Sequence, residues 1–186
     1  MPPASKRPPE DEPPGPYFLT TDRLGFRTWR AADLPLALAL WGDPEVTRFI
    51  ARAPLSAAEV ETRLATEIAS NRAHGIQYWP IFLRRQDAHV GCCGLRPHPP
   101  DERVLELGVH LRPPYRGQGL AEEASRAAIR HAFQELGARE LFAGHHPENA
   151  ASRRLLLKLG FQPAGAGYYP PTGLVHPSYR LPAAEC

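Results

Sequence analysis

The stretch LELGVHLRPPYRGQGLA, residues 105–121, contains a strand, a glycine loop and the start of a helix in immediate succession. Apolar and other side chains alternate over residues 105–111, which is the period-2 pattern of a half-buried strand. Pro113 and Pro114 end that strand, because proline donates no ladder hydrogen bond. From Leu120 to Leu136 the apolar residues recur at helical spacing, which predicts an amphipathic helix that ends at Gly137.

The loop between strand and helix has the features of an anion site. Gly117 and Gly119 permit a tight turn, and the helix that follows presents free N–H groups and the positive end of its dipole. Arg116 adds a cation, so a phosphate or pyrophosphate is the predicted ligand. A Walker loop would need a Gly-Lys-Ser/Thr sequence, and a Rossmann fingerprint would need a third glycine where Glu122 stands.

The pattern Arg116-x-x-Gly119-x-Ala121 is similar to the Arg/Gln-x-x-Gly-x-Gly/Ala signature of the GNAT acyl-CoA N-acyltransferases. The preceding ELGVHL and the later PENAAS and KLGF resemble the same superfamily in register, and the resemblance spans Thr20 to Leu181. The ribosomal-protein alanine N-acetyltransferases are the branch that the chain resembles most. The resemblance implies an N-acetyltransferase that uses acetyl-CoA as co-substrate and a primary amine as acceptor, either a protein N-terminus or a small molecule.

The expected fold class is α/β, with the GNAT arrangement of a central mixed, mostly antiparallel sheet and about four flanking helices. The expected order is β-α-α-β-β-β-α-β-α-β-β. Strands are predicted at 20–30, 78–83, 89–95, 105–111, 139–145 and 178–181, and helices at 34–41, 56–72, 120–136 and 150–159. Asp33 resembles an N-cap, Ser56 opens a capping box, and Pro80 indicates an edge strand or a bulge.

Composition indicates one domain in a chain of 186 residues. Residues 1–18 are proline-rich and are predicted to form a disordered tail before a domain at 19–186. A net charge of +2 without a dense basic run gives no indication of nucleic-acid binding. The absence of a long apolar run and of a Cys-x-x-Cys pair leads us to expect a cytoplasmic protein without a membrane segment. The family resemblance implies a monomer or homodimer.

The resemblance assigns the cofactor site. The loop from Arg116 to Ala121 would hold the pyrophosphate of acetyl-CoA through its backbone N–H groups, with contributions from Arg116, Gly117, Gln118, Gly119, Leu120 and Ala121. The backbone of Val109, His110 and Leu111 would supply the oxyanion donor on a strand that splays from its neighbour.

Two residues are candidates for proton transfer from the acceptor amine. Glu106 and His110 share one face of the strand, two pleats apart, and Glu106 is the preferred base because many relatives are acidic at this position. A salt bridge from Glu106 to an arginine is the alternative role, and a water chain is the alternative base.

Asn149 and Ser152 stand at a helix start, where an N-cap role alone would explain them. The resemblance adds a CoA contact for Asn149 and a role for Ser152 as the acid toward the CoA sulfur. The tyrosine acid of many relatives would stand at position 156, where this chain has Leu156, so solvent is the other proton donor.

Other reactive residues favour structural roles. His145, His146 and Glu148 do not make a metal site, because neighbouring residues on a strand point to opposite faces. Direct acyl transfer needs no covalent Cys93 intermediate. Trp41, Phe49 and Ile50 are candidates for the acceptor wall, with a place in the core as the preferred alternative.

Two other functions remain open. A non-catalytic acyl-CoA-binding regulatory module would keep the loop and dispense with Glu106 and Ser152. An ATP-binding protein would use the same glycine loop, but the chain has no lysine or Mg²⁺-binding aspartate in register.

Overall fold

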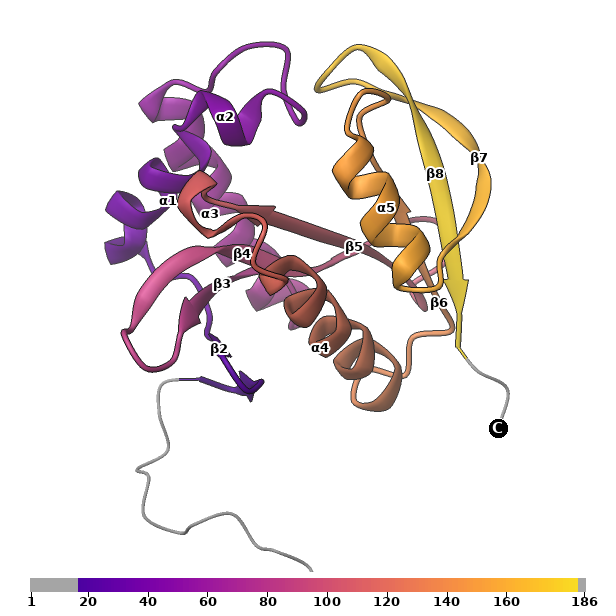
Figure 1. Cartoon of the computed structure of the whole chain (residues 1–186), viewed down its shortest axis with the longest axis horizontal. Helices are drawn as coiled ribbons and strands as arrows, with labels where there is room; N and C mark the ends of the chain where they lie inside the picture. Colours follow the sequence, from indigo (N-terminus) through magenta and orange to yellow (C-terminus); the bar gives the residue numbers. More distant parts are fainter. Residues whose placement is uncertain (1–16, 184–186) are drawn as a thin grey trace, which may run out of the picture.

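One mixed sheet of eight strands runs through the whole protein, for which the computed structural model describes residues 17–183 (Figure 1). The strand order is β1-β2-β3-β4-β5-β6-β8-β7, and every neighbouring pair is antiparallel except β5 and β6. The strands are β1 (Leu19–Thr20), β2 (Leu24–Phe26), β3 (Tyr78–Leu83), β4 (Ala88–Pro97), β5 (Val104–Leu111), β6 (Glu140–Gly144), β7 (Gln162–Tyr169) and β8 (Leu174–Pro182).

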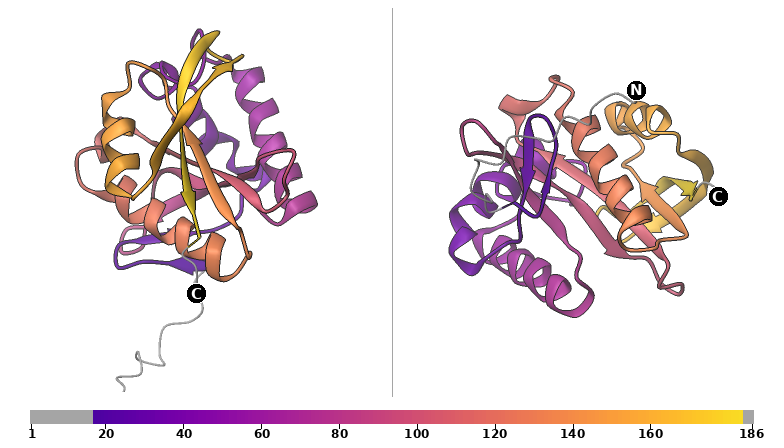
Figure 2. Two further views of the ribbon diagram at one scale, coloured as in Figure 1. Left: turned by 90° about the vertical axis from the view of Figure 1, so that its right-hand side faces the viewer. Right: turned by 90° about the horizontal axis from the view of Figure 1, so that it is seen from below.

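Helices cover both faces of the sheet, as the view along its edge shows (Figure 2). The helices are α1 (Leu34–Trp41), α2 (Pro44–Thr47), α3 (Ala57–His74), α4 (Leu120–Gln134) and α5 (Ala150–Lys158). Buried residues of α4 and α5 share one core with β5, while those of α1 and α3 share the other with Tyr78 and Cys92. This architecture confirms the predicted α/β class and GNAT arrangement, with five α-helices where about four were expected.

The two longest helices begin where the sequence predicts, while their ends differ from the predicted boundaries by two residues. Ser56 and Glu59 form the predicted capping box at the start of α3, and Gly75 ends the helix at φ 71°. Gly119 at φ 77° precedes α4. Helix α4 ends at Gln134, before the predicted boundary, so Leu136 does not continue the apolar face and is 40% exposed.

The strand predicted at 20–30 is instead two short strands, β1 and β2, joined by a turn. Thr21 closes that turn, because its N–H donates to Leu24 O and its hydroxyl accepts from Leu24 N–H. Asp33 precedes α1 but makes no side-chain cap. Its carboxylate accepts hydrogen bonds from the Arg27 guanidinium and from Arg30 N–H, which tie the chain after β2 into a tight bend.

Pro80 lies on the interior strand β3 opposite Cys92, and the register with β4 shifts between Ile81 and Phe82, where β4 holds the extra residue Val90. A bulge therefore lies close to Pro80, but its extra residue is on β4. The carbonyl of Pro80 faces β2 and accepts from Arg27 N–H. The β2 ladder ends at Ile81, so the missing N–H of proline has no strand partner to satisfy.

Of the predicted tail, residues 1–16 lie outside the described residues. Tyr17 and Phe18 contact the domain: the Tyr17 hydroxyl donates to Asp87, and the Phe18 ring packs at 5.1 Å from that of Trp79.

Candidate active site

Strands β5 and β6 separate in the middle of the sheet. Their parallel ladder consists of the pairs from Val104 to Glu106, although β5 continues to Leu111 and β6 to Gly144. The edge of β5 beyond Glu106 is therefore open toward β6, and the expected splay is present.

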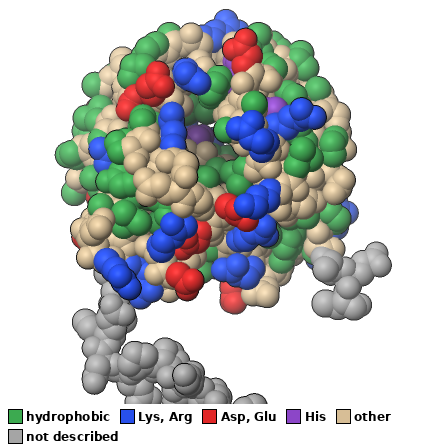
Figure 3. Space-filling model, in the orientation of Figure 1, with side chains coloured by type: hydrophobic (Ala, Val, Ile, Leu, Met, Phe, Trp, Pro, Cys, Tyr) green, Lys and Arg blue, Asp and Glu red, His purple; other side chains and the backbone are tan. Residues whose placement is uncertain are grey.

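A cavity of about 890 Å³ occupies this opening. It is lined by the second half of β5, the loop before α4, the start of α5 and the hairpin of β7 and β8. In the space-filling view the surface is hollowed near its centre, and histidine side chains are visible inside the hollow (Figure 3). One cavity thus joins the glycine loop to the candidate base Glu106 and the candidate acid Ser152.

The open edge of β5 turns backbone groups of alternate residues toward the cavity. Arg112 N–H donates to Val90 O on β4, and in an antiparallel ladder the groups of every second residue point to the same neighbour. The N–H and C=O groups of Val109 and Leu111 therefore face away from β4, toward the opening. The resemblance predicts oxyanion donors among the N–H groups of Val109, His110 and Leu111, and those of Val109 and Leu111 face the opening. The backbone of His110 instead faces β4, so His110 contributes only its side chain to the cavity.

The glycine loop is built as the sequence predicts. Gly117 and Gly119 have φ values of 74° and 77°, and a Cβ added to Gly117 would meet no atom within 4 Å. The helical ladder of α4 starts with Glu123 N–H, which donates to Gly119 O. The amides before it have no intrahelical acceptor and stand at the positive end of the helix, beside the cavity.

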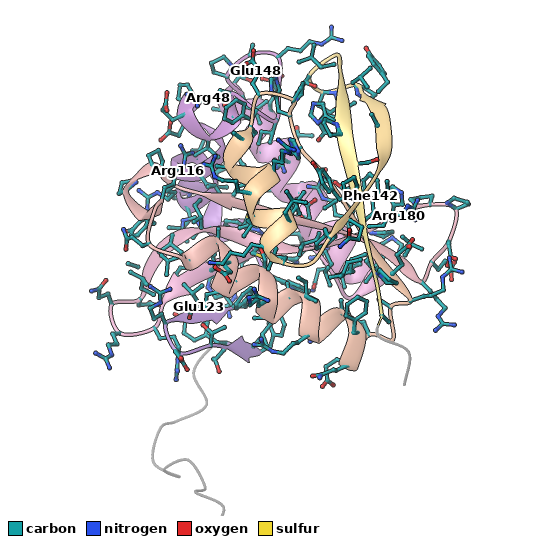
Figure 4. The ribbon with its side chains drawn as sticks, turned by 45° about the vertical axis from the view of Figure 1, so that its right-hand side comes forward. Arg48, Arg116, Glu123, Phe142, Glu148 and Arg180 are labelled. Atoms are coloured by element: carbon teal, nitrogen blue, oxygen red, sulfur yellow. The ribbon has the colours of Figure 1, made fainter. Side chains whose placement is uncertain are left out.

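The polar side chains of this loop hold it in place. Arg116 lines the cavity, but its guanidinium donates to Leu111 O (3.1 Å) and to Glu45 O (3.0 Å), which ties the loop to β5 and α2 (Figure 4). The side-chain amide of Gln118 donates to Pro114 O, and the backbone carbonyl of Gln118 accepts from the Arg23 guanidinium. The predicted cation is present at the site, with two of its donors used by the protein itself.

Glu106 lies on the face of β5 that α1 and α3 cover. Its Oε1 accepts a hydrogen bond from the Tyr78 hydroxyl at 3.4 Å. Among residues 17–183, no arginine or lysine forms an ion pair with Glu106. The alternative that Glu106 serves a salt bridge therefore receives no support. The Tyr78 ring fills the space over Gly108, where an added Cβ would lie 2.3 Å from it.

His110 shares that face but is held as a neutral ring. Trp41 Nε1 lies 3.3 Å from His110 Nδ1, and because an indole N–H is only a donor, Nδ1 accepts. Burial lowers the pKa of His110 well below its usual value, and the charges of Arg63 and Arg96 lower it further. A ring with Nδ1 occupied and its proton on Nε2 is a poor base, which favours Glu106 in that role.

Asn149 and Ser152 line the cavity at the start of α5. The Asn149 side chain caps the helix, since its Oδ1 accepts from Ser152 N–H at 3.0 Å. The capping role is thus real, and it leaves the Asn149 amide NH₂ and the Ser152 hydroxyl available to a ligand. Leu156 is buried and lines the cavity, so an apolar side chain stands where many relatives place the tyrosine acid.

The remaining candidates divide between core and cavity. Trp41 is fully buried and belongs to the core, as the preferred alternative stated, whereas Phe49 and Ile50 line the cavity. Burial raises the pKa of Cys93 to about 12, so this residue is a thiol at neutral pH and a poor nucleophile. No group of histidine, cysteine or carboxylate side chains within residues 17–183 could hold a metal ion. In the same range, no helix is both long and apolar enough to span a membrane.

Sequence reasoning missed much of the cavity lining, including four polar side chains. Arg63, Tyr78, Arg96 and Tyr169 line the cavity together with Glu106. Two of them are held by Glu67, a fully buried carboxylate that binds the Arg96 guanidinium and accepts from Tyr78 N–H at 2.8 Å. The sequence signal was a carboxylate on the apolar face of α3, since Glu67 follows Val60 and Leu64 at helical spacing.

The family described as "Acetyltransferase (GNAT) domain" matches residues 23–162. The chain belongs to the GNAT acetyltransferase family. Among curated proteins, this GNAT chain is 30% identical over 150 residues to the uncharacterized N-acetyltransferase YoaA of Bacillus subtilis (80% of this chain, 84% of the relative). It is 28% identical over 148 residues to the uncharacterized N-acetyltransferase p20 of Bacillus licheniformis (79% and 83%).

Solved structures share the fold of this GNAT acetyltransferase. An acetyltransferase of the GNAT family from Bacillus anthracis superposes with a TM-score of 0.75 at 20% identity, covering 88% of this chain and 97% of its own. A ribosomal-protein-S5-alanine acetyltransferase from Vibrio fischeri superposes with a TM-score of 0.68 at 15% identity, covering 88% and 94%. These likenesses establish the fold, and the family establishes acetyl transfer with acetyl-CoA as the co-substrate.

Proposed function

We propose that this GNAT acetyltransferase transfers an acetyl group from acetyl-CoA to a primary amine by direct attack within a ternary complex. The observation that carries the proposal is the open edge of β5, which joins the glycine loop at one end to Glu106 at the other inside one cavity. A protein N-terminal amine and a small-molecule amine are both candidate acceptors. The protein N-terminal amine is included because the chain shares its fold with a ribosomal-protein-S5-alanine acetyltransferase.

Residues of β5, the glycine loop and α5 have separate roles in the proposed reaction. The loop from Arg116 to Ala121 binds the pyrophosphate through amides at the start of α4. The backbone N–H groups of Val109 and Leu111 stabilise the carbonyl oxygen as it gains negative charge. Asn149 contacts the cofactor from the start of α5.

Glu106 accepts the proton of the attacking amine, directly or through a water, since a protonated amine has no lone pair to attack with. Ser152 donates a proton toward the departing CoA sulfur from the start of α5. Its loss slows the reaction without abolishing it, because a thiolate is a stable leaving group at neutral pH.

A calorimetric titration with acetyl-CoA tests the cofactor site. Gly119→Glu places a carboxylate at the proposed pyrophosphate loop, and we expect micromolar binding by the wild type to be lost in this variant. Gly137→Glu is the matched control. Gly137 also has a positive φ (64°), but it is not among the residues that line the cavity, and no atom lies within 4 Å of an added Cβ. Failure of the wild-type protein to bind acetyl-CoA would overturn the proposal, and so would equal losses in both variants.

Turnover then separates an enzyme from a binding module. Release of the CoA thiol in the presence of an amine panel supports transfer. Tight acetyl-CoA binding without turnover of any amine would support the non-catalytic module instead.

A further inference from the structure

Arg63 is a cation in the cavity wall whose charge no carboxylate of the described residues balances. It lines the cavity from α3, and its guanidinium lies 4.6 Å from the centre of the Trp41 ring. Its Nε is buried without a hydrogen-bond partner. A guanidinium cannot lose its proton, so this site carries a fixed positive charge with unused donors.

The carboxylates that could pair with Arg63 along its own helix are engaged elsewhere. Glu59, one turn before it, accepts from the backbone N–H and hydroxyl of Ser56 in the capping box. Glu67, one turn after it, binds Arg96 and Tyr78 N–H. Burying part of an unpaired cation is unfavourable unless a partner arrives, which points to an anionic group on a ligand.

That anion does not belong at the pyrophosphate loop. Arg63 lies with Trp41 and Cys92 on the face of the sheet that α1 and α3 cover, whereas the glycine loop leads into α4 on the opposite face. Glu106 and His110 point to the Arg63 face, because Tyr78 contacts both of them there.

Contacts connect Arg63 to Glu106 in a short series across the cavity wall. The Arg63 guanidinium packs on Trp41, whose indole binds His110. The His110 ring packs at 5.7 Å against that of Tyr78, whose hydroxyl binds Glu106. Tyr169 lines the same cavity, where burial and the charge of Glu106 raise its pKa and the charges of Arg63 and Arg96 lower it. A positive and a negative side chain thus line the same cavity.

We infer that the acceptor is a small amine that also carries a carboxylate, such as a free amino acid. Its amine lies at Glu106, and its carboxylate binds the Arg63 guanidinium through two hydrogen bonds. Arg96 does not compete for the carboxylate, because Glu67 neutralises it. This inference rests on the proposed function and narrows its acceptor from any primary amine to an amino acid rather than a protein N-terminus.

Matched pairs of acceptors test the inference. Thiol release is measured with leucine against leucinamide and with 4-aminobutyrate against n-butylamine, where the second member of each pair lacks the carboxylate. Leucinamide also stands for a protein N-terminus, whose first residue has no free carboxylate. We expect the carboxylated member of at least one pair to have a kcat/KM about 10- to 100-fold higher, as for a hydrogen bond to a charged group.

Variants then assign the preference to Arg63. Arg63→Gln should lower kcat/KM for the preferred carboxylated amine by about the same factor, leave the neutral partner unchanged, and leave the acetyl-CoA affinity unchanged. Arg63→Lys should retain part of the preference, because it keeps the charge but not the two-pronged geometry. Arg72→Gln is the control, since Arg72 is exposed on the same helix.

The outcomes separate this inference from the proposed function. Acetylation of neutral amines at the same kcat/KM as their carboxylated partners would overturn the inference and leave the proposed function standing. An equal loss with both members of a pair in Arg63→Gln would also overturn it, because Arg63 would then be structural. No acetylation of any amine would overturn the proposed function itself. Thermal unfolding of each variant confirms that it is folded, and the wild-type comparison needs no variant.

Discussion

Trp41 Nε1 donates a hydrogen bond to His110 Nδ1 across 3.3 Å, which joins a fully buried indole to the floor of the cavity. The bond assigns the proton of the neutral imidazole to Nε2. It explains how a histidine on the same strand face as Glu106 can line the site without competing for the acceptor's proton.

The first prediction concerns the protonation state of His110. Because burial and the charges of Arg63 and Arg96 lower its pKa, the ring should remain neutral as the pH falls below 6.5. Nitrogen chemical shifts in ¹⁵N-labelled protein should show protonated Nε2 and unprotonated Nδ1. In Trp41→Phe only the Cys92 thiol, 3.6 Å from Nδ1, remains as a weak donor, and a mixture of tautomers should appear. A His110 ring that is charged at pH 6.5 in the wild type would contradict this account.

The second prediction concerns stability in acid. Burial, followed by the charge of Arg112, lowers the pKa of His89 from 6.5 to about 4. The unfolded chain therefore binds a proton at a higher pH than the folded chain, and stability falls as the pH drops from 6.5 to 4. His89 alone should account for about 2–3 kcal/mol of that fall, given about 1.4 kcal/mol per pKa unit.

Denaturant unfolding at several pH values checks the role of His89. His89→Leu removes the titrating ring and keeps apolar contact with Trp29 and Phe82, whose rings pack against it. Its unfolding free energy should decline less between pH 7 and pH 4, whatever its constant offset at pH 8. An unchanged decline would show that other groups carry the pH dependence.

The third prediction separates the base from the cofactor site. Glu106→Gln keeps the size of the side chain and its hydrogen bond to Tyr78 but cannot accept a proton at neutral pH. We expect kcat to fall about 10²- to 10⁴-fold while the calorimetric affinity for acetyl-CoA stays constant. Glu102→Gln, an exposed change just before β5, is the control. Turnover that survives in Glu106→Gln would favour a water chain as the base.

The fourth prediction separates the two roles of Asn149. Aspartate is as good an N-cap as asparagine, so Asn149→Asp should keep the stability of α5, whereas Asn149→Ala should lose about 1 kcal/mol. Both variants lack the amide NH₂ group, and aspartate adds a negative charge beside the cofactor. Acetyl-CoA affinity should therefore fall in both, and more in Asn149→Asp. If the variants change stability but not the affinity for acetyl-CoA, Asn149 acts only as the N-cap of α5.

The elements and the glycine loop were readable from the sequence because their signals are local. Alternation over 105–111, helical spacing from Leu120 and the capping box at Ser56 depend on neighbours within a few residues, and each appears in the structure. The boundaries were less secure. The first strand became β1 and β2 because Thr21 and Asp33 bind backbone groups of the turn and the bend, which no periodicity records.

The site itself depends on tertiary structure. Glu106, Gly119, Asn149 and Ser152 were candidates from pattern and family resemblance, but only the separation of β5 from β6 after Glu106 makes them line one cavity. Arg63 and Tyr78 could not be identified from the sequence, because only the folded protein places them in the same cavity as Glu106. Sequence by itself determined which segments form strands, helices and the loop, since these follow from local backbone preference and side-chain spacing. The packing of α3 against the sheet decided which charges are paired and which one remains for a ligand, since long-range contacts alone set that balance.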